Sequence, residues 1–185
     1  MKIHYKGIVH ERTEDSPFVS AIVVAPTCNF KCKGCFNRDL KKQENKVATA
    51  EEIIAEVMSN PFNEGVTFSG LEWSESPNEL VELVKVASDK GLKIMIYTGC
   101  KLEQFHARIG LACADKVNLP KELREDKSSL MWSYIGSQIL DFYILEDYFI
   151  KCGKYEADKV VEDRVHFGVK LATENQIVYK IARDK

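Results

Sequence analysis

The chain of 185 residues is expected to fold as an α/β protein whose central sheet is built from parallel βαβ units. Apolar runs at 18–25, 66–68 and 92–97 have the composition of strands. Two amphipathic stretches with helix-start signals separate these runs. A strand followed by a helix and a second strand makes parallel neighbours joined by a right-handed crossover. This alternation therefore predicts a parallel sheet with helices packed against it.

The first strand is predicted over Phe18 to Ala25, a β-branched run typical of a strand buried on both faces. Residues 36–47 are polar and rich in lysine, which predicts a loop or a weak helix with a solvated face. Contact of this charged segment with an acidic partner is the alternative. Thr49 and Glu52 form a capping box, which starts a helix through about Met58.

The second strand is predicted at 66–68, and a second helix follows it. Ser76 is the expected N-cap of this helix, with Pro77 in its first turn and Glu79 completing a capping box. Gly91 fits the C′ position that ends the helix. The third strand is predicted at 92–97.

The second half of the chain contains further helical patterns. An amphipathic helix is predicted over 101–109, with His106 at its surface or half-buried. Aromatic residues at helical spacing over 131–143 are expected to pack in the core. Partner docking through an exposed Trp132 is the alternative for this stripe. A charged run at 121–127 precedes it.

Composition limits the class of protein. A hydrophobic content of 45% in 185 residues predicts one domain, 1–185, with a sizeable core. No apolar run has the length of a membrane span, and the first residues lack a signal-peptide pattern. The net charge of −2 gives no electrostatic case for nucleic acid or a membrane surface. Six cysteines without an export signal predict a reducing, cytoplasmic location.

Three cysteines, Cys28, Cys32 and Cys35, follow the first strand at C-x3-C-x2-C spacing. Thiolates this close on one loop can turn toward one point and hold a soft metal centre. An iron–sulphur cube needs four ligands, so three cysteines leave one iron open. A zinc site or an electron-transfer cluster would need a fourth protein ligand, and the remaining cysteines form no second close pair. Both remain as alternatives.

The other three cysteines give weaker evidence for a role in the metal site. Cys100 and Cys113 are expected to be buried small apolar residues, because free cysteine is among the most buried residue types. The sequence does not decide whether Cys152 joins the site or is a strand residue.

Two further segments are predicted to meet the cysteine loop, since ligands of parallel sheets bind beyond the C-terminal ends of the strands. They are Gly70-Leu71-Glu72-Trp73 and Tyr97-Thr98-Gly99. A glycine turn lets backbone approach a ligand, and the Glu72 carboxylate can bind an ammonium group. A surface carboxylate is the alternative. Thr98 either contacts a ligand or satisfies nearby backbone.

The cysteine motif resembles the signature of the radical S-adenosylmethionine (SAM) enzymes. This resemblance implies an incomplete parallel β/α barrel in which Cys28, Cys32 and Cys35 ligate a [4Fe-4S] cluster. The amino and carboxylate groups of SAM would then chelate the open iron.

A second resemblance to this superfamily follows the second strand. Gly70 and Glu72 align with the Gly-Gly-Glu-Pro sequence that contacts the methionine amino group in radical SAM enzymes. Leu71 and Trp73 depart from that pattern.

Within this superfamily the segment 32–37, CKGCFN, resembles the C-x-G-C-F-N of the activating enzyme of anaerobic (class III) ribonucleotide reductase. The segments 97–99, 147–155 and 175–176 are also similar to that activase, whereas 111–146 fits poorly. This resemblance implies that the cofactor site includes further residues of these segments, namely Phe36, Asn37, Tyr97 and Thr98.

The implied reaction is reductive cleavage of SAM to methionine and a 5′-deoxyadenosyl radical, which removes hydrogen from a glycine of the reductase. No side chain is assigned a catalytic role, because cluster and cofactor supply the reactivity. The implied partners are the glycyl-radical subunit of the reductase and a flavodoxin-type electron donor. The alternatives are a small radical SAM enzyme such as a 7-carboxy-7-deazaguanine synthase, and a non-enzymatic zinc or iron–sulphur binding module.

Overall fold

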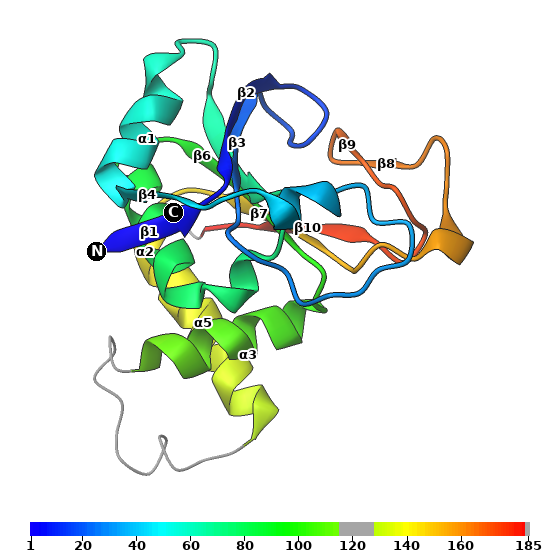
Figure 1. The fold of residues 1–185 in the computed structure, drawn as a ribbon. Helices are drawn as coiled ribbons and strands as arrows, with labels where there is room; N and C mark the ends of the chain where they lie inside the picture. The colour runs from blue at the N-terminus through cyan, green and yellow to red at the C-terminus, as the bar shows by residue number, and fades with distance from the viewer. Residues whose placement is uncertain (115–127, 184–185) are drawn as a thin grey trace.

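A six-stranded sheet with the strand order β10-β7-β6-β5-β3-β2 forms the centre of the computed structural model, which describes residues 1–114 and 128–183. Its four inner strands run parallel: β3 (Ser20–Val24), β5 (Gly65–Ser69), β6 (Lys93–Thr98) and β7 (Tyr148–Cys152). The edge strands β2 (Gly7–Arg12) and β10 (Ile177–Ile181) are antiparallel to their neighbours. The predicted α/β fold with a mostly parallel sheet is therefore confirmed (Figure 1).

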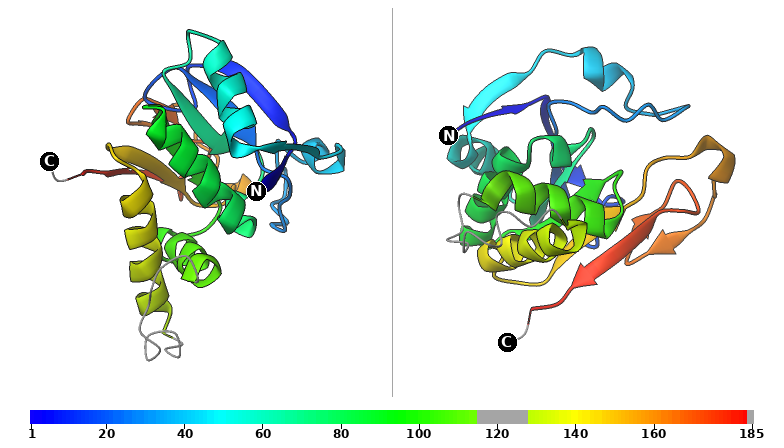
Figure 2. Two further views of the ribbon diagram at one scale, coloured as in Figure 1. Left: turned by 90° about the vertical axis from the view of Figure 1, so that its left-hand side faces the viewer. Right: turned by 90° about the horizontal axis from the view of Figure 1, so that it is seen from below.

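The helices lie together on one face of this sheet (Figure 2). They are α1 (Ala50–Ser59), α2 (Pro77–Asp89), α3 (Leu102–Cys113) and α5 (Ser129–Tyr143). The inner strands follow one another in space in the same order as in the chain, so successive right-handed crossovers return on the same side. A doubly wound sheet would instead reverse its strand order and carry helices on both faces. The predicted closure into an incomplete barrel stays a prediction.

Two small antiparallel sheets flank the main one. Near the N-terminus, β1 (Lys2–Tyr5) pairs with β4 (Lys46–Thr49), and a hairpin joins β8 (Val165–His166) to β9 (Val169–Lys170). The sequence did not reveal β1, β2 or β4, because these short strands lack the continuous apolar run of the inner strands. Strands β1 and β4 also pair with each other from far apart in the chain.

Both faces of the sheet are covered by apolar side chains. The larger cluster lies between the sheet and the helices, and the buried stripe of α1 contributes Ile53, Ile54 and Val57 to it. A smaller cluster comprises Phe18, Met95, Val169, Leu171 and Val178. Val169 of β9, together with Leu171, therefore helps to cover part of the second face.

Of the two predicted capping boxes, one forms and the other does not. Thr49 and Glu52 form the predicted capping box, with Thr49 N donating to Glu52 Oε2 at 2.8 Å. The box predicted at Ser76 is wrong, although Pro77 does begin α2. The backbone N–H of Ser76 already donates to Trp73 O, at the end of the 3₁₀ turn η2 (Trp73–Glu75), so it is not free for Glu79. The prediction for Gly91 is confirmed, because it follows the C-cap with a φ of +72°.

Helix α5 confirms the predicted aromatic helix, and it crosses α3 at close range. A Cβ added at Gly136 would lie 1.8 Å from His106 O. Trp132 is buried, which confirms the expected core packing at this residue and contradicts the alternative of docking through an exposed Trp132. Core packing is wrong for Tyr134 and Phe142 of the same stripe, which are exposed. His106 is also buried, contrary to the expectation of a surface or half-buried position, because the crossing covers it. The charged run at 121–127 lies outside the described residues.

Among the described residues, no helix combines the length and apolar character that a membrane crossing requires.

Candidate functional site

The cysteine loop leaves the C-terminal end of β3 and returns through the short 3₁₀ helix η1 (Asp39–Lys42) to β4. Two side-chain contacts hold it. Lys41 Nζ donates to Phe30 O at 2.7 Å, and Glu75 Oε1 accepts from Asn29 N at 2.7 Å. A charged donor or acceptor makes such bonds stronger than bonds between neutral groups. The Glu75 bond therefore ties the loop to the body of the protein at Asn29, whereas the Lys41 bond braces the loop internally.

All three cysteines of the loop are free, half-buried thiols that line one pocket. The same pocket is lined by residues that follow three neighbouring parallel strands, namely Gly70 after β5, Gly99 after β6 and Gly153 after β7. This is the end of the sheet where ligands of α/β proteins bind. The predicted convergence of the strand-end segments is thus seen in the structure.

Glu72 is the residue that joins these loops. Its side chain is buried and accepts three hydrogen bonds: Oε1 from Ser74 N (3.0 Å) and Thr98 Oγ1 (2.9 Å), and Oε2 from Gly99 N (2.7 Å). Its own backbone N–H donates to Thr27 O at 2.9 Å, next to the first cysteine. Glu72 therefore connects the loops after β3, β5 and β6. Its Oε2 accepts one of these bonds and retains acceptor capacity toward the pocket.

The turn around Glu72 is held by its first glycine and by the two residues that depart from the Gly-Gly-Glu-Pro pattern. Gly70 has a φ of +83°, and a Cβ there would lie 2.7 Å from Val24 Cγ1. Only glycine suits this conformation and this close approach. Leu71 and Trp73 are buried, and Trp73 Nε1 donates to Val23 O at 3.0 Å. The two departing residues thus anchor the turn in the core.

Tyr97 and Thr98 both line the pocket, but their hydroxyl groups already have partners. Tyr97 OH donates to Asp15 O at 2.8 Å, and Thr98 Oγ1 donates to Glu72. The Thr98 hydroxyl also accepts from Cys100 N at 3.1 Å, so it satisfies nearby backbone, as the alternative in the sequence analysis expected. Each of the two can still present its ring face, methyl group or backbone to a ligand.

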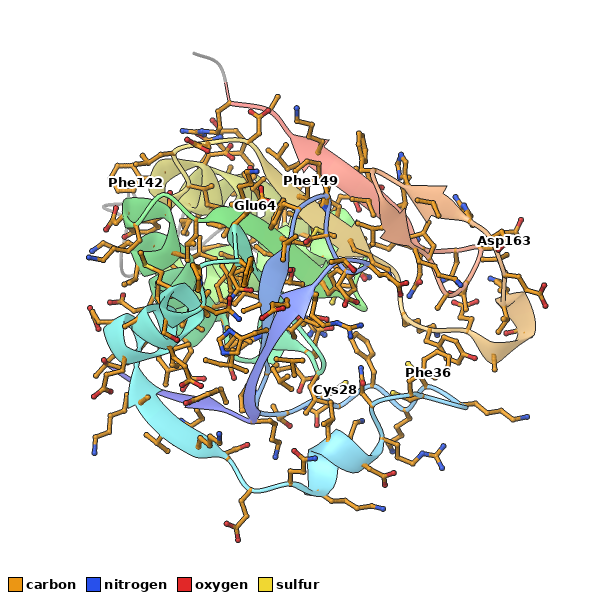
Figure 3. All side chains as sticks on the ribbon, turned by 90° about the horizontal axis from the view of Figure 1, so that it is seen from above. Cys28, Phe36, Glu64, Phe142, Phe149 and Asp163 are labelled. Atoms are coloured by element: carbon orange, nitrogen blue, oxygen red, sulfur yellow. The ribbon has the colours of Figure 1, made fainter. Side chains whose placement is uncertain are left out.

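Asn37 and Phe36 differ in their position relative to the pocket. Asn37 lines the pocket, whereas Phe36 lies outside the set of lining residues with 77% of its surface exposed. The Phe36 ring packs edge-on against Tyr155, with 4.9 Å between ring centroids. Figure 3 shows Phe36 and Cys28 on the same loop.

Lys151 is a pocket residue that sequence reasoning missed. It lies on β7, is buried, and its Nζ is 4.5 Å from the centroid of the Tyr97 ring and 3.3 Å from Lys170 O, to which it donates. Burial lowers the pKa of Lys151 to about 8, and the charge of Asp15 offsets this only in part. A lysine inside an otherwise apolar strand, Tyr148–Cys152, was the available signal.

The remaining cysteines lie outside the pocket lining. Cys100, Cys113 and Cys152 are buried, which confirms the expectation for the first two. Burial raises the pKa of the Cys152 thiol to about 12, so it is a protonated strand residue at neutral pH.

The donor set fits an iron–sulphur cluster by its chemistry. Thiolates are the ligands of such clusters, and no cysteine or histidine beyond the three of the loop is among the described residues that line the pocket. In the described part of the chain, no three His, Cys, Asp or Glu side chains are grouped closely enough to hold a metal ion. Ligation by all three cysteines therefore requires the loop to draw its thiols together.

Comparison with known proteins points to the same loop. Residues 18–139 match the family described as a 4Fe-4S single cluster domain. A protein of Methanocaldococcus jannaschii named as a glycyl-radical enzyme activating enzyme is 30% identical over 129 residues, 69% of this chain and 53% of that protein. The pyruvate formate-lyase-activating enzyme of Clostridium pasteurianum is 30% identical over 90 residues, 45% of this chain and 38% of that enzyme. The matches thus span about half or less of these relatives.

Proposed function

Since this chain belongs to the family of 4Fe-4S single cluster domains, we propose that it is a radical SAM enzyme that activates a glycyl-radical enzyme. Cys28, Cys32 and Cys35 would bind the [4Fe-4S] cluster, as their spacing and their shared pocket support. When bound, cluster and SAM supply the reductive cleavage that yields a 5′-deoxyadenosyl radical. The observation that carries the proposal is the meeting of three free thiols with the Glu72 turn at the strand ends.

The protein's own residues bind, orient and shield. Glu72 holds the loops after β3, β5 and β6 in one arrangement, and its Oε2 is available to accept a bond from the SAM ammonium group. Gly70 lets the backbone approach the ligand, and Asn37, Tyr97 and Thr98 complete the cofactor site. A fixed set of polar groups lowers the cost of orienting a charged ligand.

For the target we propose the glycyl-radical subunit of an anaerobic ribonucleotide reductase, with a flavodoxin-type protein as electron donor. The C-x-G-C-F-N sequence at 32–37 supports this choice among activases. Helices gathered on one face and strands in monotonic order support an incomplete barrel, whose opening would admit a loop of a partner protein.

The first test is low-temperature electron paramagnetic resonance of the anaerobically reconstituted and reduced protein, with and without SAM. We expect a [4Fe-4S]⁺ signal that shifts when SAM is added. Replacing any one of Cys28, Cys32 and Cys35 by alanine is expected to abolish the signal. Cys113→Ala, at a buried cysteine outside the pocket, serves as the matched control and should retain it. Bound zinc, or a cluster that ignores SAM, would contradict the proposal.

The second test concerns the target. The reduced, SAM-loaded protein is mixed with an anaerobic ribonucleotide reductase and, separately, with pyruvate formate-lyase. We expect a glycyl-radical signal with the reductase. A signal with pyruvate formate-lyase alone would keep the activase function and change its target. Cleavage of SAM that depends on a small molecule and needs no partner protein would favour a synthase of the 7-carboxy-7-deazaguanine type.

A further inference from the structure

Positive charge in this protein is concentrated in the cysteine loop. Residues 31–46 contain six lysine and arginine residues and two acidic residues, whereas the whole chain has a net charge of −2. The remainder of the chain is therefore distinctly acidic. A local field of opposite sign to that of the whole molecule steers an oppositely charged partner to one place.

Part of this charge is used inside the protein, and part is free. Lys42 pairs with Asp39 at 2.8 Å, and Lys41 donates to Phe30 O. Lys31, Lys33 and Arg38 of the loop are exposed, and so is Lys154, which lines the same hollow as Lys31 and Lys33. We name these four residues the basic surface. Across the part of the chain that the structure describes, no acidic side chain lies within ion-pair distance of any of these four. Their charge is therefore available to a partner.

The basic surface borders two hollows that lead to the cysteines. One lies between the cysteine loop and residues 154–158, with Lys31, Lys33 and Lys154 in its lining together with Cys32. The other is lined by Arg38 together with Cys32 and Cys35. A protein seated on these cations would therefore lie directly over two of the three thiols.

An exposed aromatic side chain lies beside these cations. Phe36 is 77% exposed although it belongs to the cysteine motif, and its only described ring partner is Tyr155, at the edge of the first hollow. Aromatic residues and arginine are enriched at interfaces between proteins. The far wall of the hollow carries Glu156 and Asp158. A wall with acidic residues suits a protein surface of mixed sign better than a phosphate backbone.

From these observations we propose that the basic surface is the docking site of a small acidic protein that carries one electron, such as a reduced flavoprotein. The carrier loses one electron, as when a flavin hydroquinone becomes the semiquinone, and the iron–sulphur group held by the cysteines gains it. The inference rests on the proposed function, since it requires an electron acceptor at Cys32 and Cys35. It adds the place of docking and the residues that recognise the donor.

Binding is tested with a recombinant flavodoxin as the probe, by surface plasmon resonance on the cluster-loaded protein at low and at high salt. The double variant Lys31→Glu, Lys33→Glu is expected to bind about tenfold more weakly at low salt, because close charge pairs set the association rate. Salt should weaken binding to the wild type and have little effect on the variant. The matched control Lys85→Glu, Lys90→Glu changes two exposed lysines at the opposite end of the sheet and should bind as the wild type does.

Two outcomes would overturn the proposal in this assay. One is equal flavodoxin binding by the Lys31→Glu, Lys33→Glu variant and the wild type. The other is binding of a short oligonucleotide in preference to flavodoxin, which would assign the surface to nucleic acid. Because Lys31 and Lys33 lie between the cysteines, iron content is measured for every variant. Arg38→Glu is tested in parallel, since it leaves the residues between the cysteines unchanged.

Activity separates this proposal from the proposed function. SAM cleavage is measured with dithionite, a small reductant that needs no docking site, and with reduced flavodoxin. We expect the Arg38→Glu variant to equal the wild type with dithionite and to be several-fold slower with flavodoxin. Equal rates with flavodoxin would overturn the docking site. A wild type that holds its cluster but cleaves no SAM with dithionite would overturn the proposed function, while the binding assay still decides the docking site.

Discussion

At the scale of single residues, Glu72 has a structural role in the site in addition to the ligand role that its motif indicates. Sequence reasoning treated it as a ligand for an ammonium group, and that role remains a proposal. The structure adds a second role, because its carboxylate accepts from Ser74, Thr98 and Gly99 and is buried. A buried acceptor with three donors is costly to remove, since each donor is left without a partner.

Replacing Glu72 by alanine is therefore expected to lower the free energy of unfolding by about 2–4 kcal/mol. Thr98→Val removes one of the three bonds and should cost about 1 kcal/mol. Both changes are measured by urea unfolding. If Glu72→Ala weakened SAM binding but left stability unchanged, Glu72 would be a ligand residue only, and its role in joining the loops would be wrong.

Burial of Lys151 is expected to make the stability of the protein depend on pH. Its folded pKa of about 8 lies below the ordinary lysine value of 10.5 because the side chain is buried. Between these two values the unfolded chain binds more protons than the folded chain, so the lysine makes stability rise with pH. Below about pH 8 the lysine is charged in both states, and the full cost of burying the charge applies.

We expect the difference in unfolding free energy between wild type and Lys151→Met to change by up to about 3 kcal/mol from pH 7 to 10.5, in favour of the wild type at high pH. Comparing the two proteins at each pH cancels the titration of the other groups. Lys90→Met, at an exposed lysine, is the control and should give a constant difference. A constant difference for Lys151→Met as well would show that its amine is not desolvated.

At the scale of elements, the pair α3 and α5 is held together by two glycines. A Cβ at Gly110 would lie 2.2 Å from Trp132 O, and one at Gly136 would lie 1.8 Å from His106 O. The backbones therefore approach more closely than any side chain allows. The same crossing buries His106 and Trp132.

Gly136→Ala tests this packing, because the two possible effects on the free energy of unfolding have opposite signs. Helix propensity alone predicts that alanine stabilises the helix by about 1 kcal/mol. The close approach predicts instead a loss of at least about 2 kcal/mol, because the helices must separate. Gly7→Ala is the control, since nothing lies within 4 Å of an added Cβ there. Urea unfolding of both variants shows which effect is larger. A stabilised Gly136→Ala variant would contradict the crossing geometry.

At the scale of the whole molecule, the chain places its chemistry at one end of the sheet. The loops after β3, β5, β6 and β7 all line the same pocket. A ligand bound there contacts segments that are far apart in the chain, so binding should stabilise the fold as a unit.

For the reconstituted protein, SAM at about 100 times its Kd is expected to stabilise the fold by about 2.7 kcal/mol. For a chain of this length that corresponds to a rise in Tm of about 5–10 °C. The variant with alanine at Cys28, Cys32 and Cys35 should show no shift, and Cys113→Ala should shift as the wild type does. Equal shifts in all three proteins would mean that SAM binds away from the cysteine loop. The measurement is differential scanning calorimetry under anaerobic conditions.

Much of the fold was predictable because its signals are local. The strand at 18–25, the capping box at Thr49 and the helix over 131–143 depend on residues within one or two turns of one another. The box at Ser76 failed because a local pattern competed with the 3₁₀ turn η2 that precedes it. Strands β1 and β4 were missed because they pair with each other from far apart in the chain. Strand β2 was missed because it lacks a continuous apolar run, although β3, its partner, follows it directly.

The same division holds for the site. The cysteine spacing, the glycine before Glu72 and the alternation of strands and helices could be read from the sequence alone, and the alternation places both motifs at one end of a parallel sheet. Three features became visible in the folded structure alone: Glu72 joins three loops, Lys151 is buried in the pocket wall, and Phe36 faces solvent. Burial and hydrogen bonds depend on which distant residues fill the surrounding space, and spacing along a chain carries no information about those neighbours.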